Sequence, residues 1–257
     1  MPITFYKYHG TGNDFIIIDN RNGVFPKHDE KHIQKMCSRR FGIGADGLLL
    51  LEKSDVADFK MIYFNADGKE GSMCGNGGRC IVHFANLLGV IKNKTVFEAI
   101  DGLHTAQIEE NIVRLKMNDV TEVVQKEDSV FLDTGSPHHV QWVTGLETYP
   151  VFEQGKKIRN KLYGEQGSNI NFIEQTEANK VSVRTYERGV EAETLSCGTG
   201  VTAAAIALHA TRKSSSNSIE IKTKGGVLNV DFYKEKNTYK EIFLTGEATL
   251  VFKGEWI

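Results

Sequence analysis

The chain has 257 residues, of which 40% are apolar and 25% are charged, a composition typical of a globular protein with a packed core. That length suits one large domain or two domains of about 120 residues. The net charge of −2, without a long basic stripe, excludes nucleic acid as the expected partner, and no apolar run reaches the roughly 18–20 residues of a membrane span. Because the N-terminus lacks a signal-peptide layout, we expect a cytoplasmic protein.

Short strands dominate the first half of the chain. Apolar alternation between turn residues predicts them at 3–8, 15–19, 48–52, 59–65, 95–99, 104–109 and 113–117. Helices are expected over 29–40 and in the apolar stretch that follows Cys74. The glycine-rich loop at 9–14 runs into a strand and not a helix, which excludes a dinucleotide-binding fingerprint.

The second half of the chain repeats this style. Strands are expected at 129–133, 140–143, 169–174, 180–187, 219–223, 227–233, 241–245 and 248–253, with a turn at 135–139 and a helix over 201–211. The polar, strand-poor segment 119–128 is the expected boundary, which gives domains over 1–118 and 129–249. Many short strands around one apolar helix per half predict a mainly antiparallel α+β fold.

A cysteine stands directly before glycine at the start of each apolar helix. Residues 72–80 are Ser-Met-Cys-Gly-Asn-Gly-Gly-Arg-Cys, and Cys197 begins Cys-Gly-Thr-Gly. A helix N-terminus attracts a carboxylate and lowers the pKa of a thiol placed beside it. Small or apolar residues follow both cysteines at the same helical offsets, which predicts a duplication, with two similar half-chains facing each other.

The other two cysteines, Cys37 and Cys80, lie on apolar helical patterns and are expected to be buried. The spacing from Cys74 to Cys80 differs from that of a zinc knuckle, and no Cys or His pair completes such a set near Cys197. We therefore expect no metal and no other cofactor. Structural disulfides are not expected in a cytoplasmic chain of this length.

Two thiols on opposite sides of one carbon can invert a stereocentre without a cofactor, because one thiolate removes a proton while the other thiol delivers one. Helix N-termini directed at the substrate carboxylate would stabilise the carbanion as it forms. The residues therefore predict a racemase or an epimerase and leave its substrate open. The alternative is that each cysteine is only a buried residue at a tight helix start.

Several other polar residues have two interpretations. His138 follows a proline in a polar turn and is either a surface or capping group or general-base support for one thiol. Glu187 and Arg188 form either an exposed ion pair or a clamp for a carboxylate or an amine. Three asparagines are either turn residues or ligand contacts: Asn13, Asn65 and Asn169.

Eight short motifs follow one another along the chain. They are His-Gly-Thr-Gly-Asn-Asp-Phe at 9–15, Gly-Ile-Gly-Ala-Asp-Gly at 42–47, Asn-Ala-Asp-Gly at 65–68, Met-Cys-Gly-Asn-Gly at 73–77, Gly-Ser-Pro-His at 135–138, Ser-Asn-Ile-Asn-Phe at 168–172, Glu-Arg-Gly-Val at 187–190 and Cys-Gly-Thr-Gly at 197–200. With these eight motifs in this order, the chain closely resembles the diaminopimelate epimerases, which are cofactor-independent enzymes of bacterial lysine and cell-wall precursor synthesis.

The resemblance implies interconversion of LL- and meso-2,6-diaminopimelate, with Cys74 and Cys197 as acid–base partners supported by His138 and Glu187. It implies that four backbone N–H groups hold the reacting carboxylate: those of Gly75, Asn76, Gly198 and Thr199. It also implies that five residues bind the substrate, largely its distal amino-acid end: Asn13, Asn65, Asn169, Glu187 and Arg188. The family fold is two pseudo-symmetric domains, each a barrel-like roll of strands around a central helix, with the last strand, near 250–257, returning to the first domain.

Three features depart from the family pattern. Ser136 stands where many members carry Asn, which bears on one substrate contact, and Gly47 has no side chain where some relatives have Gln. The segment 190–194 is one residue longer than the common form, which bears on the loop before Cys197. None of these departures removes a thiol or Arg188.

Two rival interpretations remain. A proline racemase or hydroxyproline epimerase has a similar fold, but a cyclic amine needs no distal clamp, so the Glu187–Arg188 pair and the three asparagines argue against it. An amino-acid-binding or thiol-redox module would not require both cysteines together. Facing thiols also predict a reversible disulfide between Cys74 and Cys197 on oxidation, provided that closure brings their Cα atoms within about 7 Å. The sequence leaves the oligomeric state open, a homodimer included.

Overall fold

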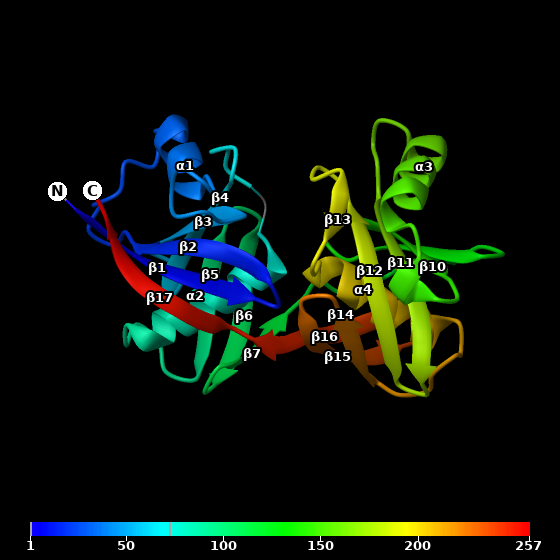
Figure 1. Cartoon of the computed structure of the whole chain (residues 1–257). Helices are drawn as coiled ribbons and strands as arrows, with labels where there is room; N and C mark the ends of the chain where they lie inside the picture. Colours follow the sequence, from blue (N-terminus) through cyan, green and yellow to red (C-terminus); the bar gives the residue numbers. More distant parts are fainter. Residues whose placement is uncertain (1, 72) are drawn as a thin grey trace. The chain divides into compact units, whose positions relative to one another are not determined.

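The computed structural model describes residues 2–71 and 73–257. The chain divides into two compact units, one formed by Met1–Leu115 with Gly246–Ile257 and the other by Lys116–Thr245 (Figure 1). Among the described residues no helix is both long and apolar enough to cross a membrane.

The first unit is a mixed sheet around helix α2 (Gly75–Leu87). Its strands are β1 (Ile3–Gly10), β2 (Asn13–Asp19), β3 (Gly47–Glu52), β4 (Phe59–Asn65), β5 (Lys94–Ala99), β6 (Gly102–Glu109), β7 (Ile112–Lys116) and β17 (Thr249–Trp256). Their order is β17-β1-β2-β3-β4-β5-β6-β7; the β2–β3 and β4–β5 neighbours are parallel and the others antiparallel. Helix α1 (Glu30–Cys37) joins β2 to β3, and β17 runs beside β1 (Figure 1).

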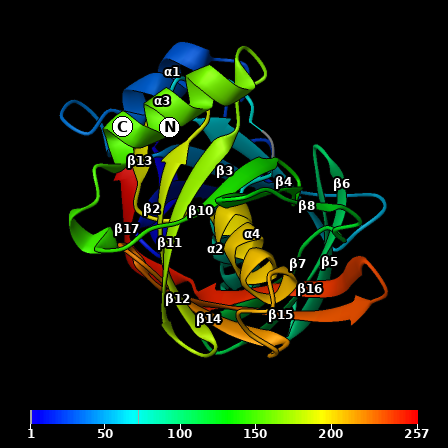
Figure 2. The ribbon, with the colours of Figure 1, turned by 90° about the vertical axis from the view of Figure 1, so that its right-hand side faces the viewer.

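The second unit is built in the same way around helix α4 (Gly198–Ala210). Its strands are β8 (Val123–Gln125), β9 (Ser129–Asp133), β10 (Pro137–Trp142), β11 (Asn169–Glu177), β12 (Lys180–Glu187), β13 (Ala192–Thr194), β14 (Ser218–Thr223), β15 (Gly226–Glu235) and β16 (Thr238–Glu247). Their order is β8-β9-β10-β11-β12-β14-β15-β16, with β13 also on β12. Figure 2 shows these strands curving around α4. Helix α3 (Val151–Tyr163), preceded by the short helix η1 (Leu146–Thr148), joins β10 to β11.

The two units repeat one topology. Counted along each strand order, the third and fifth pairs of neighbouring strands are parallel in both units. These are β2–β3 and β4–β5 in the first unit and β10–β11 and β12–β14 in the second. Helices α1 and α3 occupy matching connections, as do α2 and α4. The predicted duplication and the α+β class are confirmed.

The central strands have continuous apolar sequences because they are buried. Ile16–Ile18 on β2 and Leu48–Leu51 on β3 are fully buried, because the parallel pair is covered on both faces. One face packs with α1 in a cluster that includes Ile33 and Met36, while Leu49 on the other face lies against Gly77 of α2. Helix α4 is apolar on all sides, as expected of a helix enclosed by a sheet.

Two local expectations were wrong, and one helix was missed. The segment 119–128 is not strand-poor, because β8 lies within it and pairs with β9. The expected turn at 135–139 ends earlier, since Pro137–Trp142 forms β10 and places His138 in a strand. Helix α3 was not predicted, because it is mostly polar and buries only Val151 and Gly155.

Candidate active site

Cys74 is the residue directly before α2, with an extended backbone (φ −101°, ψ 125°) and a half-buried side chain. The first intrahelical bond runs from the Gly78 N–H to the Cys74 carbonyl (2.7 Å), so the N–H groups of Gly75 and Asn76 point beyond the helix. The Cys74 side chain makes no capping hydrogen bond, and the first turn of α2 contains no acidic residue. The thiol therefore lies at the positive end of a helix dipole, as predicted. Ser72 of the sequence motif lies outside the described residues.

The side chain of Asn13 is held in one orientation against Cys74. Its Nδ2 donates to the Asp46 carboxylate (2.7 Å), which leaves Oδ1 as acceptor for the Cys74 thiol (3.6 Å) and for Asn76 Nδ2 (3.2 Å). Asp46 is in turn paired with Arg39 (2.7 Å). The structure thus brings three of the predicted site residues together in the first unit: Asn13, Cys74 and Asn76.

Arg79 is a site residue that sequence reasoning missed. Its guanidinium is fully buried and donates to Thr11 Oγ1 (3.1 Å), Asn76 Oδ1 (3.1 Å) and the Gly75 carbonyl (3.4 Å). In the described part of the chain no carboxylate forms an ion pair with it. Burial lowers the pKa of Arg79, while thiolates at Cys80 and Cys74 act to raise it. A buried cation therefore holds the first turn of α2, and the thiols of Cys80 and Cys74 are ionisable groups that act on it.

Asn65 and Gly47 lie where β4 and β3 meet. Asn65 closes the turn after β4, with its N–H on the Lys69 carbonyl (2.9 Å) and its carbonyl accepting from Gly68 (2.9 Å), and its side chain is exposed. The described contacts do not join it to Cys74. At Gly47 a Cβ would lie 2.5 Å from the Phe64 carbonyl oxygen and 2.5 Å from the Tyr63 ring. Tyr63 thus occupies the space where a relative's glutamine would begin.

Cys197 repeats the position of Cys74 at the start of α4. Its backbone is extended (φ −122°, ψ 111°), its carbonyl accepts from Val201 N–H (2.8 Å), and the first turn again contains no acidic residue. The side chain is buried, and the Thr199 hydroxyl lies 3.5 Å from its Sγ. Thr134 Oγ1 donates to the Thr199 carbonyl (2.9 Å) and so fixes this turn to the end of β9.

His138 is fully buried on β10, so the interpretation as a surface group is wrong. Its Nδ1 lies 3.0 Å from Asn171 Nδ2 and its Nε2 lies 3.1 Å from Ser136 Oγ. Burial, with a smaller effect of the Arg188 charge, lowers the pKa of His138 to about 3. The imidazole is therefore neutral near pH 7, and Ser136 and Thr199 lie between it and Cys197.

Asn169 connects Ser136 to the Glu187–Arg188 segment. Its Oδ1 accepts from the Arg188 backbone N–H (2.9 Å), and its Nδ2 donates to Ser136 Oγ (3.1 Å). The two charged side chains have different partners: Glu187 accepts from Thr194 (2.9 Å), whereas the exposed Arg188 guanidinium donates to the Gln166 carbonyl (3.0 Å). The second unit therefore holds seven further predicted site residues: His138, Asn169, Glu187, Arg188, Cys197, Gly198 and Thr199.

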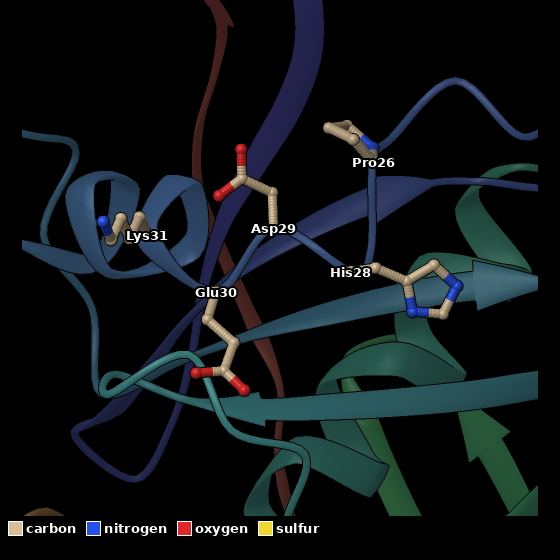
Figure 3. A pocket seen from close by; sticks show the side chains of 5 residues that line it. All are labelled: Pro26, His28, Asp29, Glu30 and Lys31. Carbon is tan, nitrogen blue, oxygen red and sulfur yellow. The ribbon is translucent and has the colours of Figure 1, made fainter.

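A functional site elsewhere in the described chain would be marked by metal ligands, disulfides or a pocket. No three His, Cys, Asp or Glu residues among those described gather as metal ligands, and all four cysteines are free thiols. A surface pocket at the start of α1 is lined by Pro26, His28, Asp29, Glu30 and Lys31, whose side chains point in different directions (Figure 3). Asp29 there caps α1 by accepting from the His32 N–H (3.0 Å).

Comparison with solved structures shows which proteins share this fold. A Bacillus anthracis phenazine biosynthesis protein of the PhzF family has a TM-score of 0.80 at 17% identity and covers 100% of this chain and 99% of its own. A hydroxyproline epimerase from Agrobacterium vitis has a TM-score of 0.70 at 16% identity and covers 99% and 92%. At such identities the likeness defines the fold alone, a two-domain repeat shared by PhzF proteins and racemase-type isomerases.

Sequence comparison then identifies the family. The family model described as diaminopimelate epimerase matches residues 5–123 and 130–251. The chain is 58% identical over 250 residues to a diaminopimelate epimerase of Flavobacterium psychrophilum, covering 96% of this chain and 98% of the relative. It is 46% identical over 255 residues to one from Chlorobaculum tepidum, covering 95% and 98%. The chain belongs to the diaminopimelate epimerase family, which confirms the resemblance seen in the motifs.

Proposed function

We propose that this chain epimerises LL-2,6-diaminopimelate to meso-2,6-diaminopimelate without a cofactor, in the synthesis of lysine and peptidoglycan precursors, and that it does so in the cytoplasm. The observation that carries the proposal is the duplicated helix start. Each unit holds a cysteine, Cys74 or Cys197, directly before a buried helix whose first turn has no acidic residue. Family membership supplies the substrate.

The two thiols act on opposite faces of one α-carbon. One thiolate takes the α-proton, and the other thiol donates a proton to the carbanion from the opposite face, which inverts the centre. The N–H groups of Gly75, Asn76, Gly198 and Thr199 bind the adjacent carboxylate and stabilise the negative charge that develops on it. Loss of one such donor typically lowers the rate by about 10²–10³.

The remaining predicted residues bind the substrate or support the thiols. Asn13, Asn65, Asn169, Glu187 and Arg188 bind the distal amino-acid end of the substrate, and Arg188 contributes a planar fork suited to a carboxylate. His138 and Glu187 support the thiols. Since the His138 ring is buried and neutral, it acts by holding hydrogen bonds in a fixed direction and not by carrying a positive charge.

The test is incorporation of solvent deuterium at the α-carbon of LL-diaminopimelate by purified protein without added cofactor. We expect one deuterium in the inverted product, because the donating thiol exchanges with water. Cys74→Ala and Cys197→Ala should each lower epimerisation by at least about 10²-fold with the fold retained. Cys37→Ala is the matched control, because Cys37 is a buried cysteine in the α1 cluster, and it should keep near-normal turnover.

Near-normal turnover by either folded site variant would contradict the two-thiol mechanism. Proline and trans-4-hydroxyproline serve as rival substrates in the same assay. Faster turnover of either than of LL-diaminopimelate would refute the proposed substrate and leave the two-thiol chemistry intact.

A further inference from the structure

We propose that Ser136 is a positioning residue that carries a one-directional set of hydrogen bonds from His138 to Thr199 and thereby stabilises the thiolate of Cys197. We call the set His138, Ser136, Thr199 and Cys197 the Ser136 relay. The inference rests on the proposed function, since it explains how one of the two thiols is readied for proton transfer. Ser136 lies in the connection between β9 and β10, next to the start of α4.

The direction of the relay begins at Asn171, which is fully buried on β11. Its Oδ1 accepts from the Thr185 hydroxyl (2.9 Å), and its Nδ2 donates to the His139 carbonyl (3.1 Å), which can only accept. The same Nδ2 lies 3.0 Å from His138 Nδ1, so this ring nitrogen is an acceptor and carries no proton. The neutral imidazole must then carry its proton on Nε2.

Two donors fill the acceptor positions of Ser136. The His138 Nε2–H points at its Oγ (3.1 Å), and Asn169 Nδ2 donates to the same oxygen (3.1 Å). The orientation of Asn169 is fixed because its Oδ1 accepts from a backbone N–H at Arg188 (2.9 Å). A hydroxyl has two lone pairs and one proton, so with both lone pairs used Ser136 must donate.

The proton of Ser136 is directed along the relay to the sulfur. Its remaining neighbour is Thr199 Oγ1 at 3.4 Å, and Thr199 Oγ1 lies 3.5 Å from Cys197 Sγ. When Thr199 accepts from Ser136, its own hydroxyl proton is available to Cys197. A donor fixed in this direction favours the thiolate over the thiol, and linked donors strengthen one another in a buried setting.

The Ser136 hydroxyl carries no charge and lies among four charged or titratable residues near the start of α4: His138, Asp133, Glu187 and Arg188. His138 is neutral, the Asp133 carboxylate at the end of β9 accepts from the Gly135 N–H (2.8 Å), and Glu187 and Arg188 lie at the end of β12. The Ser136 hydroxyl can therefore be removed without altering a charge. A change in the ionisation of Cys197 would then report the relay itself.

The experiment measures the pH dependence of iodoacetamide alkylation at Cys197 in a Cys74→Ala background, without substrate. Cys37 and Cys80 do not interfere, because burial raises the pKa of each thiol to about 12. In Ser136→Ala we expect the midpoint to rise by about one pH unit, a tenfold fall in thiolate below the midpoint. The midpoint is the readout, because a more basic thiolate is also more nucleophilic and partly offsets the fall in rate.

Three variants make the result specific. Ser136→Thr keeps the hydroxyl and should restore the midpoint. Ser168→Ala removes a buried hydroxyl bonded only to the carbonyls of Pro137 and Asn169, and should leave the midpoint unchanged. Thr199→Val should raise the midpoint at least as far as Ser136→Ala, and the double variant no further than Thr199→Val, because both changes interrupt one path.

An unchanged midpoint in Ser136→Ala overturns the proposal, whatever Thr199→Val does. Additive shifts in the double variant overturn it too, because they would mean two independent effects. Because the Cys74→Ala background is not expected to turn over substrate, the outcome does not depend on the epimerase assay. Loss of the proposed function and loss of the relay are therefore observed separately.

Discussion

The buried guanidinium of Arg79 should lower the pKa of the Cys74 thiol, and Arg79→Met tests this directly. Arg79 is five residues after Cys74, an axial rise of about 7.5 Å along a helix. At that separation and an effective dielectric constant of about 20, two unit charges interact by about 2.2 kcal/mol, or about 1.6 pKa units. Hydrogen bonds to Asn76 and to the Gly75 carbonyl hold the charge at this end of α2.

The assay is the pH midpoint of alkylation at Cys74 in a Cys197→Ala background. Arg79→Met should raise this midpoint by one to two units, about the Coulomb magnitude above. Arg21→Met is the control, because this substitution removes the same charge elsewhere in the unit. Arg21 is paired with Asp19 (2.7 Å). The reasoning is refuted if Arg79→Met leaves the midpoint where Arg21→Met leaves it.

Stability provides a second measurement on the same variant. Methionine fills a similar volume and relieves the cost of burying a cation, but it leaves Asn76 Oδ1 and the Thr11 hydroxyl without that donor. Each lost partner costs about 1–3 kcal/mol when the group stays buried. We therefore expect a folded protein with a lower Tm, which keeps the alkylation result interpretable.

Three further predictions follow from individual contacts. Gly200→Ala should lower the unfolding free energy by about 1–3 kcal/mol in urea titration, because a Cβ there would lie 2.4 Å from Asn171 Oδ1; an unchanged midpoint would show that Asn171 can move. Mild oxidation should inactivate the enzyme through a Cys74–Cys197 disulfide that dithiothreitol reverses, and non-reducing peptide mapping of an inactivated sample without that link would contradict it. Because His138 has its folded pKa lowered to about 3, its contribution to stability is complete above its unfolded pKa of about 6.5 and is lost as pH falls toward 3. Between pH 4 and 6 the unfolding free energy of His138→Gln should therefore change with pH less steeply than that of the unsubstituted protein, by up to about 1.4 kcal/mol per pH unit. Equal slopes for the two proteins would mean that the folded ring takes up its proton in this range.

The sequence alone was sufficient for the central features of each half. Continuous apolar runs such as Leu48–Leu51 predict buried strands, and a cysteine followed by glycine before an apolar helix predicts the positions of Cys74 and Cys197. These signals are local, since strand period, helix period and glycine each act within a few residues. The duplication was visible for the same reason, because it repeats a local pattern.

Features that depend on distant partners could not be predicted in this way. A charged residue on a helix is usually solvent-exposed, and the burial of Arg79 becomes clear only when Thr11, from the loop after β1, lies against it. His138 looked like a turn residue because only one of its two partners, Ser136, is near it in the sequence. The other, Asn171, comes from the next strand of the sheet. One signal was present, since Arg79 occupies a position on the apolar pattern of α2 where a core residue is expected.

The two units place equal thiols in unequal surroundings, and that inequality bears on which thiol ionises first. At the fifth position after the cysteine the first unit has Arg79 and the second has Thr202, and both donate to the carbonyl one residue after the cysteine, at 3.4 Å and 3.0 Å. The hydrogen bond is repeated, but this position carries a charge only in the first unit. Two thiols with identical surroundings would have the same intrinsic pKa, whereas a charge beside one of them determines which thiol ionises first. A full charge acts without contact and the Ser136 relay supplies only a neutral donor, so the alkylation midpoint of Cys74 should lie below that of Cys197.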